Sequence, residues 1–338
     1  HIPTNIMRAI KGNVAKEMQV TFGKTKILYL NHHDCHAASA IYCSPFKTCD
    51  YLTIDGHGEI ETCTSGFFDG KKIKKNNVVL YPHSVGLFYG VLTNFLGFKP
   101  DKDEWKTMAL ASSSKKNNLY DKKMSKLYKF TKKGFELDLS YFDYYLFDKR
   151  PNFYNKKFVS EFGEPRKPDS KLLQKHMELA GALQRAFEKI VFHLLVHVKK
   201  NGSKSDNLVL AGGAAMNCVF NGLLDKKKIF KNNFIPPWPD DLGVTIGALY
   251  LANQRLAKKK IIPERLRSAY LGPSYKDEEI LKTLKKFKVT FKKPDNLYEF
   301  VAKKIANQKL IGWFQGRMEF THRALGNRSI LADPRCKS

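Results

Sequence analysis

The sequence is poor in acidic residues and cysteines and has no long apolar run, and each shortage excludes a class of protein. Asp and Glu total 32 against 59 Lys and Arg, which gives a formal net charge of +27 over 338 residues. The six cysteines form no Cys-x-x-Cys pair and are too sparse for a disulfide scaffold. The apolar stretch 189–198 carries two His and is shorter than the roughly 20 residues of a membrane helix. We therefore expect a folded protein without a membrane partner.

Enough apolar material is present for a packed core, since hydrophobic residues make up 43% of the chain and aromatic residues 12%. At roughly 100–200 residues per domain, the length predicts two domains. The sequence changes character after Pro263, so we place the boundary near residue 260, with domains at 1–260 and 261–338. The chain opens on His1 without a signal peptide and stops after a motif-dense segment. We expect a cytoplasmic location and a fragment of a longer protein.

Strand and helix patterns alternate along the chain. Strands are predicted at 26–30 and 49–56, a hairpin at 61–73, and a strand, a glycine turn and a helix at 206–224. Helices are predicted at 32–43, 83–97, 168–200 and 240–256, and an irregular insertion or lid at 113–166. Beyond Pro263 we expect helices at 276–287 and 295–307 and a strand at 310–314. This alternation predicts an α/β fold.

A pair of histidines carries the first chemical signal. His32 and His36 are four residues apart, which on a helix places both imidazoles on one face. Alone, such a pair is usually an ordinary surface pair, and it lacks the Glu of the HExxH metallopeptidase motif. Asp55 strengthens the case, because it ends an apolar strand before Gly56 and a bare carboxylate is costly to bury. Asp241 repeats the arrangement. Two imidazoles and two carboxylates suit Fe(II), Mn(II) or Zn(II).

The glycine turn at 212–217 lies between the apolar strand and the helix that are predicted within 206–224. Gly212 and Gly213 let a ligand approach the backbone, and the start of the next helix favours a phosphate or another anion. The turn matches neither GxGxxG nor the P-loop pattern, which excludes the Rossmann and P-loop nucleotide sites. A small-residue turn for close packing of strand on helix is the open alternative.

An arginine-rich segment lies at 316–335. Arg317, Arg323 and Arg328, with Asn327, offer many donors within twelve positions. Arginine recognises oxyanions bidentately, so the segment predicts capture of a phosphate, carbamoyl phosphate or triphosphate, with a charged surface loop as the alternative.

Glu104 and Lys106 flank Trp105 and are weaker candidates for a catalytic role. Residues two apart do not face each other on a helix. A solvated loop is the favoured interpretation of this segment.

Taken together, these motifs resemble the NodU/CmcH family of O-carbamoyltransferases. They occur in the family's order over most of 30–335. The segments that carry the resemblance are HHDCHAASA (32–40), TIDGHGE (53–59), HSVGLFYGVLTNFLGFKPDKDEWKTMALA (83–111), ELAGALQRAFE (178–188), LAGGAAMNCVFNG (210–222), PDDLGVTIGA (239–248) and GWFQGRMEFTHRALGNRSILADPR (312–335).

The resemblance implies a Kae1-like domain of the actin/Hsp70/sugar-kinase superfamily, followed by the beginning of a YrdC-like α/β domain. It also implies that the N-terminal part of the first domain and most of the second are absent. In this family the YrdC-like domain makes carbamoyl adenylate from carbamoyl phosphate and ATP. The Kae1-like domain then transfers the carbamoyl group at an iron site to a hydroxyl of a small molecule, commonly a sugar or natural product.

Carried over by motif, the metal ligands would be His32, His36, Asp55 and Asp241. The nucleotide and anion contacts would be Gly56, Gly212, Gly213, Asn217, Arg317, Arg323, Asn327 and Arg328. Arg323, Glu104 and Lys106 are the candidate catalytic residues. Two departures from the family pattern stand out: Thr321 and His322 replace its Gly-Pro before Arg323, and Ala109 replaces a Gly.

Two alternatives stay open. A Kae1-type tRNA threonylcarbamoyl transferase shares the His pair and an adenylate donor, and the charge of +27 would suit tRNA. The arginine-rich segment belongs to the O-carbamoyltransferases, so a nucleic-acid partner is not our expectation. The second alternative is an inactive remnant that binds only a nucleotide.

Overall fold

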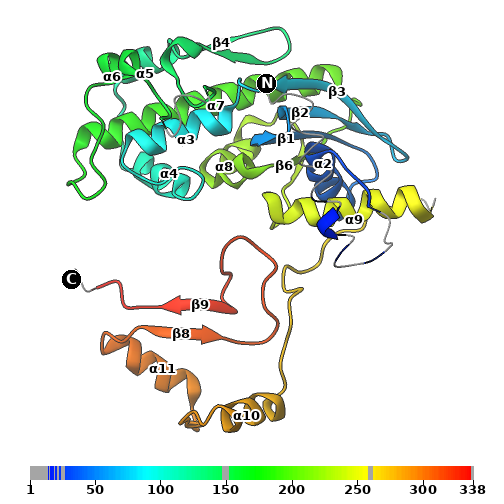
Figure 1. The fold of residues 1–338 in the computed structure, drawn as a ribbon, viewed down its shortest axis with the longest axis vertical. Coiled ribbons are helices and arrows are strands. Elements are labelled where there is room, and N and C mark those ends of the chain that lie inside the picture. Colours follow the sequence, from blue (N-terminus) through cyan, green and yellow to red (C-terminus); the bar gives the residue numbers. More distant parts are fainter. Residues whose placement is uncertain are drawn as a thin grey trace. The chain divides into compact units, whose positions relative to one another are not determined.

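The computed structural model describes residues 27–146, 152–257 and 262–335, with a few positions between 14 and 23. The chain forms two compact units, His1–Arg265 and Leu266–Ser338 (Figure 1). Each unit is described by itself.

A five-stranded mixed sheet organises the first unit. Its strand order is β3 (Ile73–Leu80), β2 (Glu61–Phe68), β1 (Cys49–Gly58), β6 (Asn207–Ala211) and β7 (Asn232–Phe234). β2 runs antiparallel to both β1 and β3, whereas β6 runs parallel to β1 and to β7. The predictions of an α/β fold and of a hairpin at 61–73 are confirmed.

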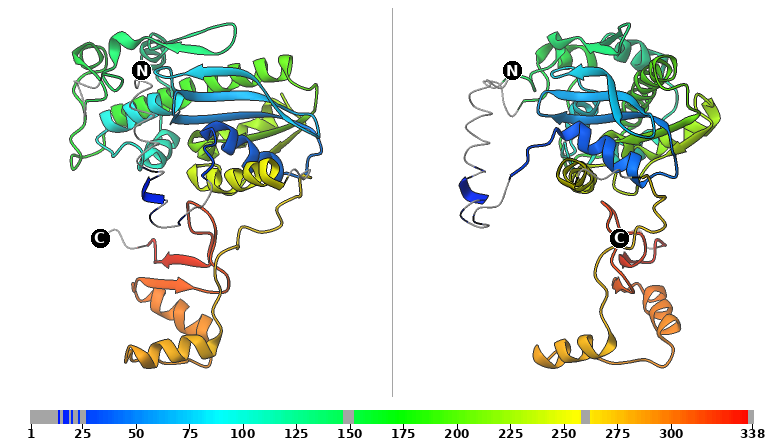
Figure 2. Two further views of the ribbon diagram at one scale, coloured as in Figure 1. Left: turned by 45° about the vertical axis from the view of Figure 1, so that its right-hand side comes forward. Right: turned by 90° about the vertical axis from the view of Figure 1, so that its right-hand side faces the viewer.

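Helices cover both faces of this sheet (Figures 1 and 2). On one face, α2 (His32–Cys43) and α9 (Asp241–Ala257) pack together and against Tyr51 and Val209. On the other face, α3 (Val85–Phe95), α7 (Gln174–Asn201) and α8 (Cys218–Lys227) pack against Leu52 and Leu210. Successive side chains of a strand point to opposite faces, so the odd-numbered residues of β1 face α2.

The segment 113–166 is more regular than predicted. After α4 (Glu104–Ser112) it forms α5 (Asn118–Ser125), β4 (Tyr128–Phe130), β5 (Phe135–Leu137), a 3₁₀ turn (Leu139–Tyr141) and α6 (Lys156–Phe162); residues 147–151 lie outside the described part. Its aromatic side chains pack against α3, with Phe158 stacked on Phe162 and edge-on to Phe95. The prediction of irregular structure was wrong for these stretches, because tertiary packing of these rings orders a lysine-rich sequence.

The predicted strand at 26–30 is also absent where it can be checked. Residues 27–30 are irregular, and Lys26 lies outside the described residues. The five-stranded sheet runs from β3 to β7, and residues 27–30 pair with neither edge strand. The longest predicted helix, by contrast, is present as α7. No helix within the described residues has the length and apolar content needed to cross a membrane.

The second unit contains α10 (Asp277–Lys286), α11 (Leu297–Ala306) and a hairpin of β8 (Ile311–Phe314) and β9 (Arg328–Leu331). The two helices and β8 were predicted, and β9 was missed. Among its described residues, Glu319 and Thr321 are the only ones buried as whole residues.

Candidate metal centre

The two histidines lie in the first turns of α2, whose start is capped by Asn31. The Asn31 side chain accepts a hydrogen bond from the Asp34 N–H at 2.9 Å. Spacing of four residues brings His32 and His36 onto one face, and their Nε2 atoms lie 3.0 Å apart. His33 points elsewhere, with its ring nitrogens 2.8 Å from Thr53 Oγ1 and 3.0 Å from the Glu61 carbonyl.

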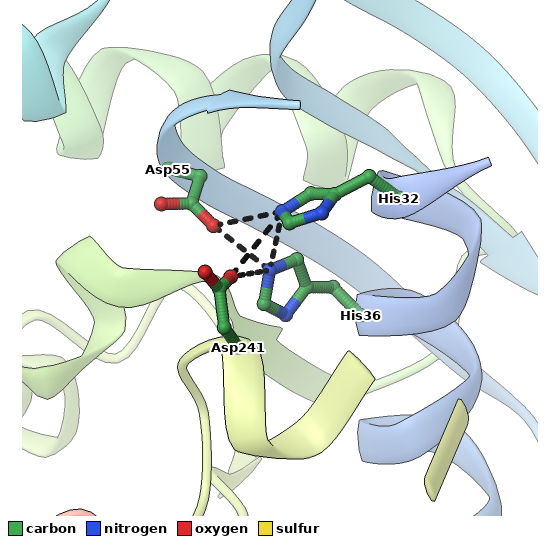
Figure 3. A group of neighbouring side chains, drawn as sticks. All are labelled: His32, His36, Asp55 and Asp241. Carbon is green, nitrogen blue, oxygen red and sulfur yellow. Dashed lines mark hydrogen bonds and ion pairs between the residues drawn. The ribbon is translucent and has the colours of Figure 1, made fainter. Parts of the chain in front are cut away.

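The two carboxylates reach the same point from other elements. Asp55 is an odd-numbered residue of β1, so its side chain faces α2. Asp241 opens α9, the helix packed beside α2. Figure 3 shows both carboxylates and both imidazoles directed toward one centre. The structure thus brings together all four predicted metal ligands.

The distances between these groups are short. Asp55 Oδ2 lies 2.8 Å from His36 Nε2 and 3.3 Å from His32 Nε2. Asp241 Oδ1 lies 3.5 Å and 3.6 Å from the Nε2 atoms of His32 and His36, respectively. One ligand atom from each residue lies within 4.8 Å of all the others. His36 is fully buried, whereas the Asp241 side chain is 80% exposed, so the centre opens on the Asp241 side.

Charge is concentrated at this centre. Burial disfavours the charged imidazole of His36, but the nearby Asp241 carboxylate and the hydrogen bond with Asp55 outweigh burial and raise its pKa to about 9. Burial likewise disfavours the Asp55 carboxylate, yet hydrogen bonds from His32 and His36 hold its pKa far below the usual range. The Asp55 and Asp241 carboxylates therefore attract a cation, either a proton on His36 or a metal ion.

The residues fit a divalent metal ion. Ligand distances of about 2.1 Å place neighbouring ligand atoms about 3.0–3.4 Å apart around one ion, close to the separations of 2.8–3.6 Å found between the imidazoles and carboxylates. Imidazole and carboxylate donors suit iron, manganese and zinc. The four side chains could hold such an ion without rearrangement of α2, β1 or α9.

The glycine turn lies against Asp55. Gly212 has φ +90° and ψ 155°, a conformation restricted to glycine, and a Cβ there would overlap the Ile54 carbonyl. A Cβ on Gly213 would lie 3.2 Å from Asp55 Oδ1, and Gly56 donates its N–H to that same oxygen at 2.7 Å. The predicted glycine contacts and the predicted metal ligands therefore share one site.

Asn217 has a structural role in this turn. Its side chain caps α8 by accepting from the Phe220 N–H at 2.9 Å. It also exchanges two hydrogen bonds with Gln184 of α7, at 2.9 and 3.1 Å. Tyr89 of α3 donates to the same Gln184 oxygen at 3.1 Å. This buried amide pair joins the glycine turn to α3 and α7.

The arginine-rich segment belongs to the second unit. Arg317 donates to the carbonyls of Gly272 and Leu271 at 3.0 and 3.2 Å, so its guanidinium joins two chain segments. Arg323 and Arg328 line an open surface depression with Trp313.

Glu319 organises the loop that carries these arginines. Its Oε1 accepts three backbone hydrogen bonds, from Leu325 and Asn327 at 2.8 Å and from Arg328 at 3.1 Å. The Asn327 side chain donates to the Arg317 carbonyl at 2.8 Å, so it too acts within the loop. Sequence reasoning missed Glu319, although an acid inside an arginine-rich motif was a possible signal.

Glu104 and Lys106 form local contacts. Glu104 accepts from the Asp101 N–H at 2.8 Å, and burial raises the pKa of its carboxyl. Lys106 pairs with Asp103 at 2.9 Å on the surface of α4. Neither side chain is joined to the four-residue centre by a hydrogen bond or an ion pair.

Comparison with known proteins identifies the family. Residues 5–250 match the family model for the carbamoyltransferase N-terminus, and residues 302–338 match that for the carbamoyltransferase C-terminus. An uncharacterised protein of Synechocystis is 38% identical over 327 residues, covering 91% of this chain and 51% of its own length. The nodulation protein NolNO of Sinorhizobium fredii is 33% identical over 341 residues, covering 99% and 47%. The chain spans about half the length of these curated relatives. It belongs to the carbamoyltransferase family.

Proposed function

We propose that this chain carries the transfer centre of an O-carbamoyltransferase, which moves a carbamoyl group from carbamoyl adenylate to a hydroxyl of a small molecule such as a sugar. The adenylate would form from carbamoyl phosphate and ATP, with one water consumed and pyrophosphate and phosphate released. The observation that carries the proposal is the cluster of His32, His36, Asp55 and Asp241 beside the Gly212–Gly213 turn, in a member of this family.

The transfer step defines what the site must provide. The hydroxyl oxygen bonds to the carbamoyl carbon, the bond from that carbon to the AMP phosphate oxygen breaks, and the hydroxyl proton passes to a base. A metal ion, with Fe(II) as our choice and Mn(II) or Zn(II) as alternatives, would supply Lewis acidity that polarises the carbamoyl group. His32, His36, Asp55 and Asp241 would hold it.

The glycine turn would receive the adenylate. No side chain projects from Gly212 or Gly213, so a nucleotide can approach the backbone beside Asp55. The exposed Asp241 carboxylate leaves this side of the centre open to the acceptor. Asn217 would act indirectly, by keeping the turn fixed through Gln184.

For the second unit we propose the beginning of the YrdC-like domain. Arg323 and Arg328, which line one depression, are the proposed contacts for a phosphate group. Arg317 would hold the loop rather than the anion, because its guanidinium already donates to two carbonyls.

Metal content tests the centre first. After anaerobic purification we expect about one iron per chain in the wild type and its loss in His36→Ala. His193→Ala is the matched control, since His193 contacts the Thr131 carbonyl and stacks on Phe130, outside the centre. Absence of metal, or equal metal in all three proteins, would contradict the proposed centre.

Transfer itself is followed in the full-length protein, because the YrdC-like domain would make the adenylate, with radiolabelled carbamoyl phosphate, ATP and a panel of hydroxylated acceptors. Label should reach an acceptor in the wild type and not in Asp55→Asn. Salt-sensitive binding of tRNA, without transfer to small hydroxyl compounds, would instead favour the threonylcarbamoyl alternative.

A further inference from the structure

The Asp55 ligand lies in a part of β1 that the sheet does not hold regularly. Pairing of β1 with β2 shifts register between Ile54 and Gly58. Pairing of β1 with β6 ends at Thr53. Asp55 and Gly56 therefore need support from outside the ladder if the carboxylate is to stay in place.

Ser84, just before α3, provides that support. Its hydroxyl lies 2.6 Å from the Gly56 carbonyl and 3.1 Å from the Asp55 carbonyl, and its single proton is shared between these two acceptors. The same oxygen accepts the Leu87 N–H at 3.1 Å and so caps α3. Ser84 is fully buried.

Gly86, in the first turn of α3, also lies close to the Asp55 and Gly56 backbone. A Cβ on Gly86 would lie 2.7 Å from the Asp55 carbonyl oxygen and 2.8 Å from the Gly56 nitrogen. Contacts this close mean that the start of α3 lies directly on the Asp55–Gly56 peptide. A shift of α3 would therefore move Asp55.

We propose that Ser84 is a positioning residue for the metal centre: its hydroxyl ties α3 to the Asp55–Gly56 backbone and so fixes the Asp55 carboxylate relative to the two imidazoles. The inference rests on the metal-binding part of the proposed function and is independent of the group transferred. Groups that orient metal ligands without touching the metal typically change affinity by about 10–100-fold when removed.

Three variants separate this role from simple helix capping. Ser84→Ala loses both the cap and the bonds to the two carbonyls. Ser84→Thr keeps a hydroxyl for both. Asn155→Ala removes a different cap in the same unit, where the Asn155 side chain accepts from Lys157 and Phe158 N–H at 3.0 and 3.3 Å.

The first measurement is Zn(II) affinity by competition with a chromogenic chelator. We expect Ser84→Ala to bind about 10-fold or more weakly, and Ser84→Thr and Asn155→Ala to stay within about 3-fold of the wild type. Equal affinity of Ser84→Ala and Asn155→Ala would reduce Ser84 to a helix cap and overturn the proposal.

The second measurement is amide hydrogen exchange of residues 55–58 in metal-free protein. Exchange should accelerate in Ser84→Ala and not in Asn155→Ala. If the wild type binds no metal, the proposed metal centre fails, and exchange still decides whether Ser84 holds Asp55. Unchanged exchange in Ser84→Ala would overturn the proposal by itself.

Discussion

His32 and His36 present their Nε2 atoms to each other at 3.0 Å across one face of α2. Two neutral imidazoles at this distance can share only one hydrogen bond, and two protonated ones repel. An ion at this point would instead use both nitrogen lone pairs together with Asp55 Oδ2. The arrangement is therefore better suited to a metal than to a structural hydrogen bond.

Metal should stabilise the first unit. At a free metal concentration of 100 times Kd, binding contributes about 2.7 kcal/mol to the free energy of unfolding. For a unit of this size, that raises Tm by roughly 5–10 °C. We expect this rise in the wild type and in His193→Ala, and its loss in His36→Ala, by thermal unfolding with Fe(II), Mn(II) and Zn(II). Equal rises in all three proteins would place the bound metal elsewhere.

Gly212→Ala should be severely destabilising. The φ of +90° strains any other residue by about 1–3 kcal/mol, and the added methyl would overlap the Ile54 carbonyl. Gly222→Ala is the matched control, because Gly222 lies in α8 with open space around its Cβ position. Its helix propensity should improve by up to about 1 kcal/mol. Urea unfolding of both variants measures the difference, and equal losses would contradict this account of the turn.

Asp50 should make stability depend on pH. It is fully buried, and burial raises the pKa of its carboxyl despite two hydrogen bonds from Ser203 and the charge of Lys199. A carboxyl with a raised folded-state pKa contributes stability that is fully present below the unfolded pKa of about 3.9. That contribution is lost as pH rises through the folded pKa.

Asp50→Asn removes this titration and tests the sign. The free energy of unfolding of Asp50→Asn, relative to that of the wild type, should increase between pH 4 and pH 8. Urea unfolding across this range provides the measurement. A difference that stays constant with pH would mean that the Asp50 carboxyl titrates alike in the folded and unfolded chains.

Glu319 should stay ionised well into the acid range. Burial favours its neutral form, but the N–H groups of Leu325, Asn327 and Arg328 outweigh burial and lower its pKa to about 2. The ordering it contributes is present above the unfolded pKa of about 4.3 and is lost as pH falls toward 2. NMR of the labelled carboxyl should thus show little titration between pH 6 and pH 3.5. A midpoint near 4.3 would mean that the loop amides do not bind it.

Local pattern was enough to predict α2, the strand β1, the hairpin turn between β2 and β3, and the four-residue cluster. His32 and His36 are four residues apart on one helix, and Asp55 ends an apolar strand before a glycine, so short-range rules apply. Asp241 was selected because it repeats the acid–glycine arrangement before a helix.

Long-range partners could not be read in the same way. The hydroxyl of Ser84 bonds to carbonyls that are 28 and 29 residues away in the sequence. The side-chain amide of Asn217 bonds to Gln184, which is 33 residues away. The segment 27–30 has strand-forming composition, but a strand also needs a pairing partner, and this segment pairs with neither edge strand of the sheet. The lysine-rich composition of 113–166 likewise gave no sign of the aromatic packing that orders parts of this segment.

The helices α2 and α9 cross so closely that a Cβ on Gly247 would overlap the Cys35 carbonyl. A Cβ on Gly58 would likewise overlap the His32 ring. Neither glycine has a side chain that could bind metal, yet each sets how near two ligand-bearing segments approach. The mutational target of this centre is consequently larger than its four ligands, and a random-variant screen for lost metal should recover glycine positions beside histidines and aspartates.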